Sequence, residues 1–148
     1  MPIKKRLHKK FSFLVFEGGN GASEEIIQDA ENKLGLKFPS DYRDYLMEFG
    51  WLEVEHYEFF GVGSGIPKYL DLKLVASEEW GEGGLYENLL PIWNNGGGDL
   101  YCIDLKQSTN DKSIICAFYH ENRQTEMVAT SFENWLTEKL AELARSKE

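Results

Sequence analysis

Carboxylates are the side chains of this sequence that are most able to do chemistry. Asp99 and Asp104 flank a strand-like segment, and Glu53, Glu55 and Glu58 form a second group. Paired carboxylates catalyse acid–base reactions when they converge and their pKa values are driven apart. Five residues along a strand span about 17 Å, and an odd offset places the two side chains on opposite faces. We therefore expect Asp99 to be a turn or binding residue and not a catalytic one.

Other signatures of catalysis or cofactor binding are weak. The run Gly96-Gly97-Gly98 lacks the Lys and the Ser or Thr that follow the glycines of a phosphate-binding loop, and it is typical of a hairpin connection. The three histidines are scattered and neither cysteine belongs to a CxxC pair, which argues against a metal site. Cys102 and Cys116 lie in apolar strand-like segments, where we expect reduced, buried thiols; a disulfide between adjacent strands is the alternative. The sequence thus predicts a non-enzyme with no cofactor.

The charge of the chain is uneven. Five of the sixteen basic side chains lie in the first ten residues, whereas the other 138 residues hold eleven basic and twenty-five acidic side chains, a net charge of −14. Such a body repels the phosphate backbone and attracts basic proteins. We therefore expect a protein partner with a basic surface and no direct binding to nucleic acid.

Length and hydropathy bound the architecture. A chain of 148 residues fits one domain with its own core. The apolar run over residues 11–16 is too short for a secretory signal, and no run reaches the ~20 apolar residues of a membrane span. We expect a cytoplasmic protein without membrane contact, a monomer or weak homodimer, in which the basic residues of the N-terminal segment 1–19 form a solvated tail ahead of a domain over 20–148.

Capping residues and hydrophobic periodicity predict the elements. Ser23 and Gly35 bound a first helix, Ser40 and Gly50 a second, and Ser131 begins the last. Residues 11–16 and 71–80 fit either a strand or a helix. Strands are predicted over residues 51–60, 89–93, 100–105, 113–119 and 125–129. This order predicts an α+β fold: a single domain with a mainly antiparallel sheet, an N-terminal helical hairpin and a C-terminal helix packed against the sheet.

Three blocks of these elements carry a family resemblance. The first consists of Gly21-Ala22-Ser23, Ile26, Glu31, Leu34-Gly35, Phe38-Pro39, Tyr42, Tyr45-Leu46 and Phe49-Gly50; the second of Leu90-Pro91-Ile92, Gly96-Gly97-Gly98-Asp99 and Tyr101-Cys102-Ile103-Asp104-Leu105; the third of Ser131-Phe132-Glu133-Asn134-Trp135-Leu136. In this order they resemble the signature of the SUKH superfamily, which includes yeast cell-wall-assembly regulators and many bacterial immunity proteins. The resemblance implies a compact non-enzymatic domain that binds another protein, in bacteria usually the toxic domain of a secreted or contact-delivered effector.

Aromatic side chains set among carboxylates are the candidate partner-binding residues. Trp80 has the surroundings of an interface anchor with an acidic rim, and Tyr57 is similar; a solvated strand face is the competing interpretation. The full candidate set is Glu53, Glu55, Tyr57, Glu58, Glu78, Glu79, Trp80, Asp99 and Tyr101.

The sequence leaves three functions open. The first is an immunity protein that neutralises a basic toxin, among which nucleases are common, by stoichiometric blockade. The second is a regulatory adaptor of cell-wall synthesis or signalling. The third is a small hydrolase or carbohydrate-binding enzyme that uses Asp99 and the tryptophans, and the lack of convergent catalytic groups argues against it.

Overall fold

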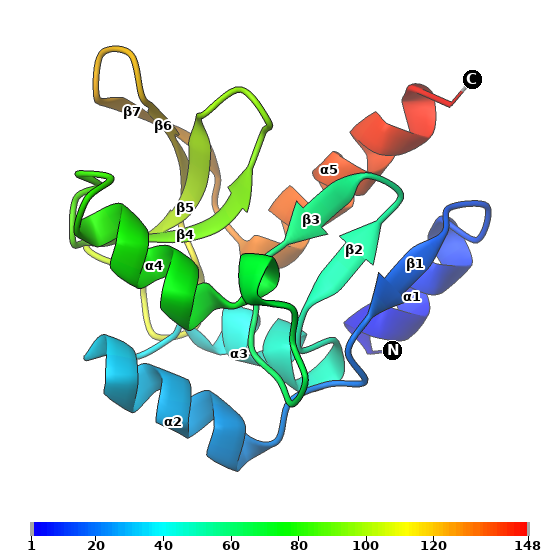
Figure 1. The fold of residues 1–148 in the computed structure, drawn as a ribbon. Helices are drawn as coiled ribbons and strands as arrows, with labels where there is room; N and C mark the ends of the chain where they lie inside the picture. The colour runs from blue at the N-terminus through cyan, green and yellow to red at the C-terminus, as the bar shows by residue number, and fades with distance from the viewer. Residues whose placement is uncertain (1, 148) are drawn as a thin grey trace.

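The predicted α+β architecture is confirmed by a computed structural model, which describes residues 2–147. Within those residues seven strands form one antiparallel sheet in the order β1-β2-β3-β4-β5-β6-β7, and five α-helices pack around it (Figure 1). The elements are α1 (Ile3–Lys10), β1 (Phe16–Gly18), α2 (Glu24–Leu34), α3 (Ser40–Glu48), β2 (Leu52–Val54), β3 (Tyr57–Phe59), the 3-10 helix η1 (Lys68–Leu70), α4 (Leu72–Trp80), β4 (Leu89–Asn94), β5 (Leu100–Asp104), β6 (Ile115–Tyr119), β7 (Gln124–Ala129) and α5 (Phe132–Arg145).

The N-terminal helical hairpin has the predicted bounds, with one correction. The Ser23 hydroxyl accepts a hydrogen bond from the Ile26 amide at 3.2 Å, and Gly35 ends α2 at a φ of 71°. The prediction that Ser40 caps α3 is wrong, because the residue before the helix is Pro39 and the Ser40 hydroxyl donates to the Asn110 carbonyl at 3.2 Å. The second helix of the hairpin is therefore tied to the loop between β5 and β6.

The prediction of a single strand over residues 51–60 is wrong. The chain reverses at Glu55 and His56, so that Val54 pairs with Tyr57 and two short strands replace one long one. Glu55 adopts a φ of 55°, a conformation that usually selects Gly or Asn in a two-residue hairpin. The sequence lacks those turn residues here, which is why the reversal could not be predicted.

Two segments whose structure the sequence leaves open are now defined. Asp71 caps α4 by accepting a hydrogen bond from the Lys73 amide at 3.1 Å, so residues 72–80 are helical. Residues 11–15 form a turn and a short connection that lead into β1. The basic N-terminal residues are not a solvated tail: they form α1, which buries Ile3 and Leu7 in the main core. The domain boundary at residue 20 stays a prediction.

Alternate side chains of the central strands serve two hydrophobic clusters. Ile103 of β5 packs in the main core that α5 covers, whereas Leu100 and Cys102 pack in a second cluster against Trp80 of α4. Cys102 pairs in register with Cys116 of β6, and both are buried free thiols, as predicted. Burial raises the pKa of the Cys102 thiol well above its ordinary value and that of Cys116 to about 12. Neither thiol is a nucleophile in the folded protein.

Candidate functional site: an acidic groove

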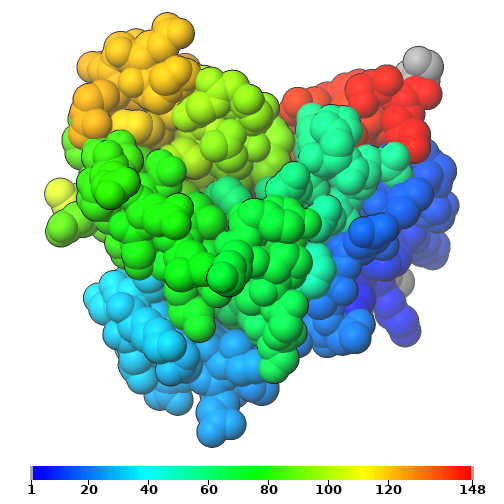
Figure 2. Space-filling model, viewed as in Figure 1, coloured from blue at the N-terminus to red at the C-terminus, as the bar shows by residue number. Residues whose placement is uncertain are grey.

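A groove of about 640 Å³ lies between strand β3, helix α4 and the first residues after β4. Figure 2 shows this face, with α4 in green below the hollow, β3 beside it, and the lime-coloured end of β4 on the other side. We call it the acidic groove. It is lined by His56, Tyr57, Glu58, Phe60, Lys68, Tyr69, Leu74, Val75, Glu78, Glu79, Trp93, Asn94, Asn95 and Gly96.

Three carboxylates give the groove its charge. Glu58 comes from β3, while Glu78 and Glu79 come from the last turn of α4, one turn beyond Leu74 and Val75 on the same face of the helix. Burial raises the pKa of Glu79, and the neighbouring Glu78 raises it further. Three acids against one lining cation, Lys68, among residues 2–147 give the groove a negative charge.

Aromatic rings form one wall of the groove and continue beyond it. The Tyr57 ring centroid lies 5.0 Å from that of Trp93, which lies 5.2 Å from that of Tyr101. The row therefore follows β3, β4 and β5 across one face of the sheet, toward α5. The Tyr57 hydroxyl donates to Glu142 of α5 at 3.1 Å, and burial, together with Glu142, raises the pKa of this phenol.

This aromatic row already holds a cation from the same chain. The Lys139 ammonium lies 4.7 Å from the Tyr101 ring centroid and 5.1 Å from that of Trp93, and it pairs with Glu142 at 3.1 Å. Lysine over an aromatic face with a carboxylate alongside is a favourable cation–π arrangement. The structure thus contains, in its own residues, an example of how this surface binds a basic side chain.

A row of glutamates crosses the strands next to the groove. Glu53 of β2 lies opposite Glu17 of β1 on one side and opposite Glu58 of β3 on the other. The Tyr69 hydroxyl donates to Glu53 at 2.6 Å, and this hydrogen bond, with the nearby negative charges, raises the pKa of Tyr69 to about 12. Like charges directly opposite each other destabilise a sheet. The fold therefore tolerates an unfavourable arrangement that a bound cation would relieve.

The structure brings together five of the nine predicted partner-binding residues. Tyr57, Glu58, Glu78 and Glu79 line the acidic groove, and Glu53 lies beside Glu58 in the glutamate row. Their recruitment of a partner stays a prediction.

The other four predicted residues lie apart from the groove. Glu55 is in the β2–β3 turn, where it accepts hydrogen bonds from the Val15 amide and from Lys147; the bond from Lys147 is the main reason that its pKa is lowered. Trp80 is half-buried, and its indole donates to the Leu89 carbonyl at 2.8 Å, which fixes α4 to β4. Tyr101 lies under Lys139.

Asp99 has a local structural role at the tip of the β4–β5 hairpin. It accepts a hydrogen bond from the His120 amide at 3.0 Å and lies 2.6 Å from the His120 Nδ1, and the backbone bond is the first cause of its lowered pKa. Asp104 instead accepts from Asn88 and from the Lys106 amide. The two aspartates thus stabilise separate turns and do not converge.

Sequence reasoning missed Tyr69, Lys68 and Trp93 as residues of this site. Trp93 reads as the end of an apolar strand, and Tyr69 lies in a segment without a clear pattern. The i, i+4 spacing of Leu74 and Glu78 was the available signal for the α4 face, and it emerges only once residues 72–80 are assigned to a helix.

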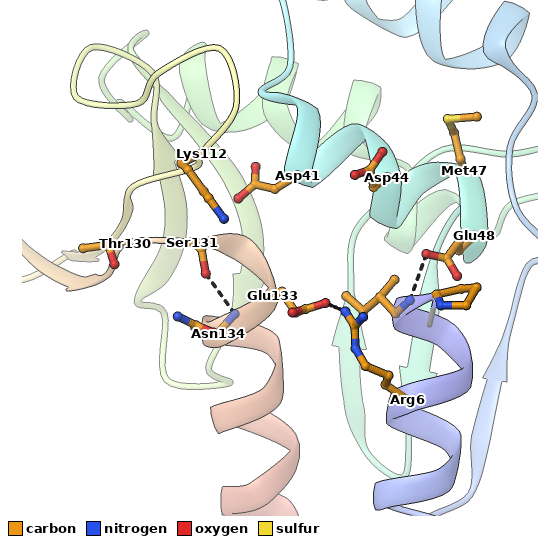
Figure 3. A pocket seen from close by; sticks show the side chains of 12 residues that line it. Arg6, Asp41, Asp44, Met47, Glu48, Lys112, Thr130, Ser131, Glu133 and Asn134 are labelled. Carbon is orange, nitrogen blue, oxygen red and sulfur yellow. Dashed lines mark hydrogen bonds and ion pairs between the residues drawn. The ribbon is translucent and has the colours of Figure 1, made fainter.

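A second cavity of about 640 Å³ lies where α1, α3 and the start of α5 meet (Figure 3). Three of its four lining carboxylates, those of Asp41, Glu48 and Glu133, hold the fold together. Asp41 accepts from the amides of Ser113 and Phe132, both at 2.9 Å, and Glu48 accepts from the first amides of α1. Glu133 pairs with Arg6. These carboxylates join α1, α3 and α5, which is why we place the functional site in the acidic groove instead.

Within residues 2–147 there is neither a cluster of metal-binding side chains nor a helix that could span a membrane. Over residues 2–147, no three His, Cys, Asp or Glu side chains come together in a group that could bind a metal ion. None of the helices in that range combines the length and the apolar composition needed to cross a bilayer.

The fold and the groove define a single-domain α+β protein with an acidic surface groove. The SUKH_6 family model, described as SMI1-KNR4 cell-wall, matches residues 24–136, which is more than half of the chain. The chain therefore belongs to the SUKH superfamily, as the sequence blocks predict. Members of this family are generally non-enzymatic immunity or regulatory proteins. The comparison with curated proteins gives no match.

Proposed function

We propose that this chain is an immunity protein that binds a cognate toxin domain in the cytoplasm and neutralises it by stoichiometric blockade. The observation that carries the proposal is the acidic groove, in which Glu58, Glu78 and Glu79 face an aromatic wall on a chain with a net charge of −9. Membership of a family that includes immunity proteins supports it.

The partner that fits this groove is a basic protein surface. Its Lys or Arg side chains pair with the three carboxylates, and the ring of the half-buried Tyr57 offers a face for cation–π contact. The Lys139 ammonium over Trp93 is the internal precedent for this mode of binding. Toxins that cut nucleic acid need Lys and Arg to bind phosphate, so an acidic protein that covers those residues blocks the substrate.

A regulatory adaptor of cell-wall synthesis or signalling is the second candidate. It is favoured by the description of the matched family, SMI1-KNR4 cell-wall. Such an adaptor also uses a binding surface and no catalytic groups. The two functions differ in the identity of the partner and in whether that partner is lethal when expressed alone.

The first experiment expresses each gene adjacent to this one in a host, with and without this chain, and scores survival and complex formation. The immunity function predicts one lethal neighbour, rescue by this chain, and a one-to-one complex that weakens between 0.1 M and 1 M NaCl, because the Debye length falls from about 10 Å to about 3 Å. If no neighbour is lethal and purification recovers cell-wall regulators, the adaptor function replaces it.

A charge reversal then tests the groove itself. Replacing both acids of α4 (Glu78→Lys and Glu79→Lys) should weaken the complex at least tenfold, which is about 1.4 kcal/mol. Glu87→Lys with Glu121→Lys is the matched control, since it changes the net charge equally and both residues are exposed and lie outside the groove lining. Equal weakening by the control would show that the effect is one of net charge and that the groove is not the contact.

A further inference from the structure

Strand β7 is an uncovered edge of the sheet. It is the last strand in the order β1 to β7, and among residues 2–147 no backbone hydrogen bond joins it to an element other than β6 and the turn before it (Figure 1). Five of its six residues are exposed. At the opposite end of the sheet, β1 is only three residues long and α1 lies beside it, with His8 stacked on Phe16 at 4.4 Å between ring centroids.

The sequence of β7 protects its edge only in part, with one charged residue, Glu126, and a bulge at Val128. Gln-Thr-Glu-Met-Val-Ala contains neither Lys nor Pro, and the outward side chains of Met127 and Val128 are 63% and 42% exposed. A register shift makes Val128 an extra residue opposite β6, and with this bulge both Met127 and Val128 line one cavity. Bulges of this kind re-aim side chains next to functional surfaces.

That cavity, of about 480 Å³, is lined by residues of β7 and α5, and one of them has an unmet hydrogen-bond donor. Trp135, one of its lining residues, is 2% exposed, and its Nε1 has no hydrogen-bond partner within the described chain. Buried N–H groups are almost always paired in folded proteins. Because this N–H is buried from solvent in the main core, the unmet donor marks incomplete packing beneath the cavity and is not a contact for the incoming strand.

The charges around strand β7 favour a basic binding partner. Glu126 on β7 and Glu138, which lines the cavity from α5, are both exposed. Glu126 accepts a hydrogen bond from the Tyr119 hydroxyl at 2.8 Å and Glu138 pairs with the exposed Arg145 at 3.4 Å, so each carboxylate keeps room for a further cation at the surface. The nearest cations are engaged: Arg123 donates to the Gly84 carbonyl at 2.6 Å, and Lys139 pairs with Glu142. A second copy of this chain, with its own net charge of −9, would be repelled here.

We propose that β7 and the adjoining cavity bind an extended basic segment of a partner protein, which adds an eighth strand to the sheet. The main-chain groups of the segment pair with the outer edge of β7, its apolar side chains contact Met127 and Val128, and its Lys or Arg side chains pair with Glu126 and Glu138. This surface is separate from the acidic groove, so the inference goes beyond the proposed function and stands or falls independently of it.

Peptides test the strand pairing directly. The probe is a capped octapeptide of alternating Lys and Val; one comparison peptide replaces Lys by Glu, and another carries N-methyl groups on a central Lys and the adjacent Val. We expect the Lys–Val peptide to shift the NMR signals of the Gln124–Ala129 amides and slow their hydrogen exchange at least tenfold. The other two peptides should bind at least tenfold more weakly, since one has the wrong charge and the other lacks two central N–H donors.

Variants of the chain test whether the Lys–Val peptide binds at the edge strand β7. Met127→Lys with Val128→Lys should weaken binding of the Lys–Val peptide at least tenfold, whereas Phe13→Lys, at a residue 58% exposed and remote from β7, should leave it unchanged. Met127→Glu keeps the edge and adds an acid, so it should tighten binding about twofold to fivefold. Circular dichroism verifies that each variant is folded.

Three results would overturn the inference. The N-methylated peptide binding as well as the parent would show charge attraction without strand pairing. If the Lys–Val peptide shifts the NMR signals of residues in the acidic groove and not those of β7, the peptide binds in the groove. Dimerisation of the free chain in sedimentation, abolished by Met127→Lys with Val128→Lys, would make a second copy the occupant. Because the toxin complex is tested by Glu78→Lys and Glu79→Lys, a failure here is distinguishable from a failure of the proposed function.

Discussion

Neutralising Glu58 should make the fold more stable. Glu58 lies directly opposite Glu53, which is itself opposite Glu17, so one substitution removes one opposed pair of like charges. A cross-strand pair is worth about 0.2 to 1 kcal/mol, and Glu58→Gln should raise the free energy of unfolding by that amount at low salt. The side chain of Glu58 is exposed, so the substitution leaves the packing unchanged.

The magnitude should double when both outer members of the row are neutralised. Glu17 and Glu58 lie on strands that are two apart and do not pair with each other, so Glu17→Gln with Glu58→Gln should give about 0.4 to 2 kcal/mol. Urea denaturation at 10 mM and at 1 M NaCl measures this gain. It should nearly vanish at 1 M NaCl, where the Debye length is about 3 Å compared with about 30 Å at 10 mM.

Glu87→Gln is the control for net charge, because Glu87 is exposed and lies outside the sheet. A gain for Glu58→Gln no larger than that of Glu87→Gln would show that the three glutamates do not repel each other measurably. A gain that persists at 1 M NaCl would point to a cause other than charge. Either result would refute the reasoning that the row is unfavourable for the fold.

Three further predictions follow from single contacts. Asp41→Ala removes hydrogen bonds to the Ser113 amide, the Ser113 hydroxyl and the Phe132 amide, and should destabilise the protein by about 3 kcal/mol or more in urea denaturation, with Asp44→Ala, a residue of the same helix, as control. The pKa of Asp99 is lowered in the folded protein, mainly by the His120 amide, so its contribution to stability is complete above the ordinary carboxyl pKa of about 3.9 and is lost as the pH falls below it; Asp99→Asn should flatten the acid side of the stability profile. Cys102 and Cys116 should not react with a thiol reagent in the native protein and should react at once in urea, because burial raises both pKa values; rapid reaction of the native protein would contradict the buried pair.

Most of the fold could be predicted because the residues that begin and end its helices and strands act through local contacts. Ser23, Gly35 and Ser131 bound helices through contacts within four residues, and the predicted bounds of the strands β4 to β7 lie within two residues of those observed. The errors arose where local signals were absent or ambiguous. Glu55 turns the chain without a Gly or Asn, and the basic composition of α1 hid Ile3 and Leu7, which lie one turn apart on its buried face.

The candidate site could be predicted only in part, for a related reason. Acidic and aromatic composition indicated Tyr57, Glu58, Glu78 and Glu79, which do share the groove. The glutamate row depends on the registers of β1 with β2 and of β2 with β3, and the second of these follows from a hairpin that the sequence did not reveal. Trp93 joins Tyr57 only through pairing between β3 and β4, which no local pattern specifies.

Glu58 gives the clearest distinction between a structural and a binding role, because the two roles predict opposite signs. If Glu58 serves the fold, Glu58→Gln should lower stability; if the glutamate row is kept for a basic partner, the same substitution should raise stability and weaken the complex. The hydrogen bond from Tyr69 reaches Glu53 and not Glu58, so no fold-stabilising contact of Glu58 is lost in the exchange. The free energy of unfolding and the affinity for the partner, both measured on Glu58→Gln, therefore separate the two roles. A higher free energy of unfolding together with a weaker complex would place Glu58 in the binding surface.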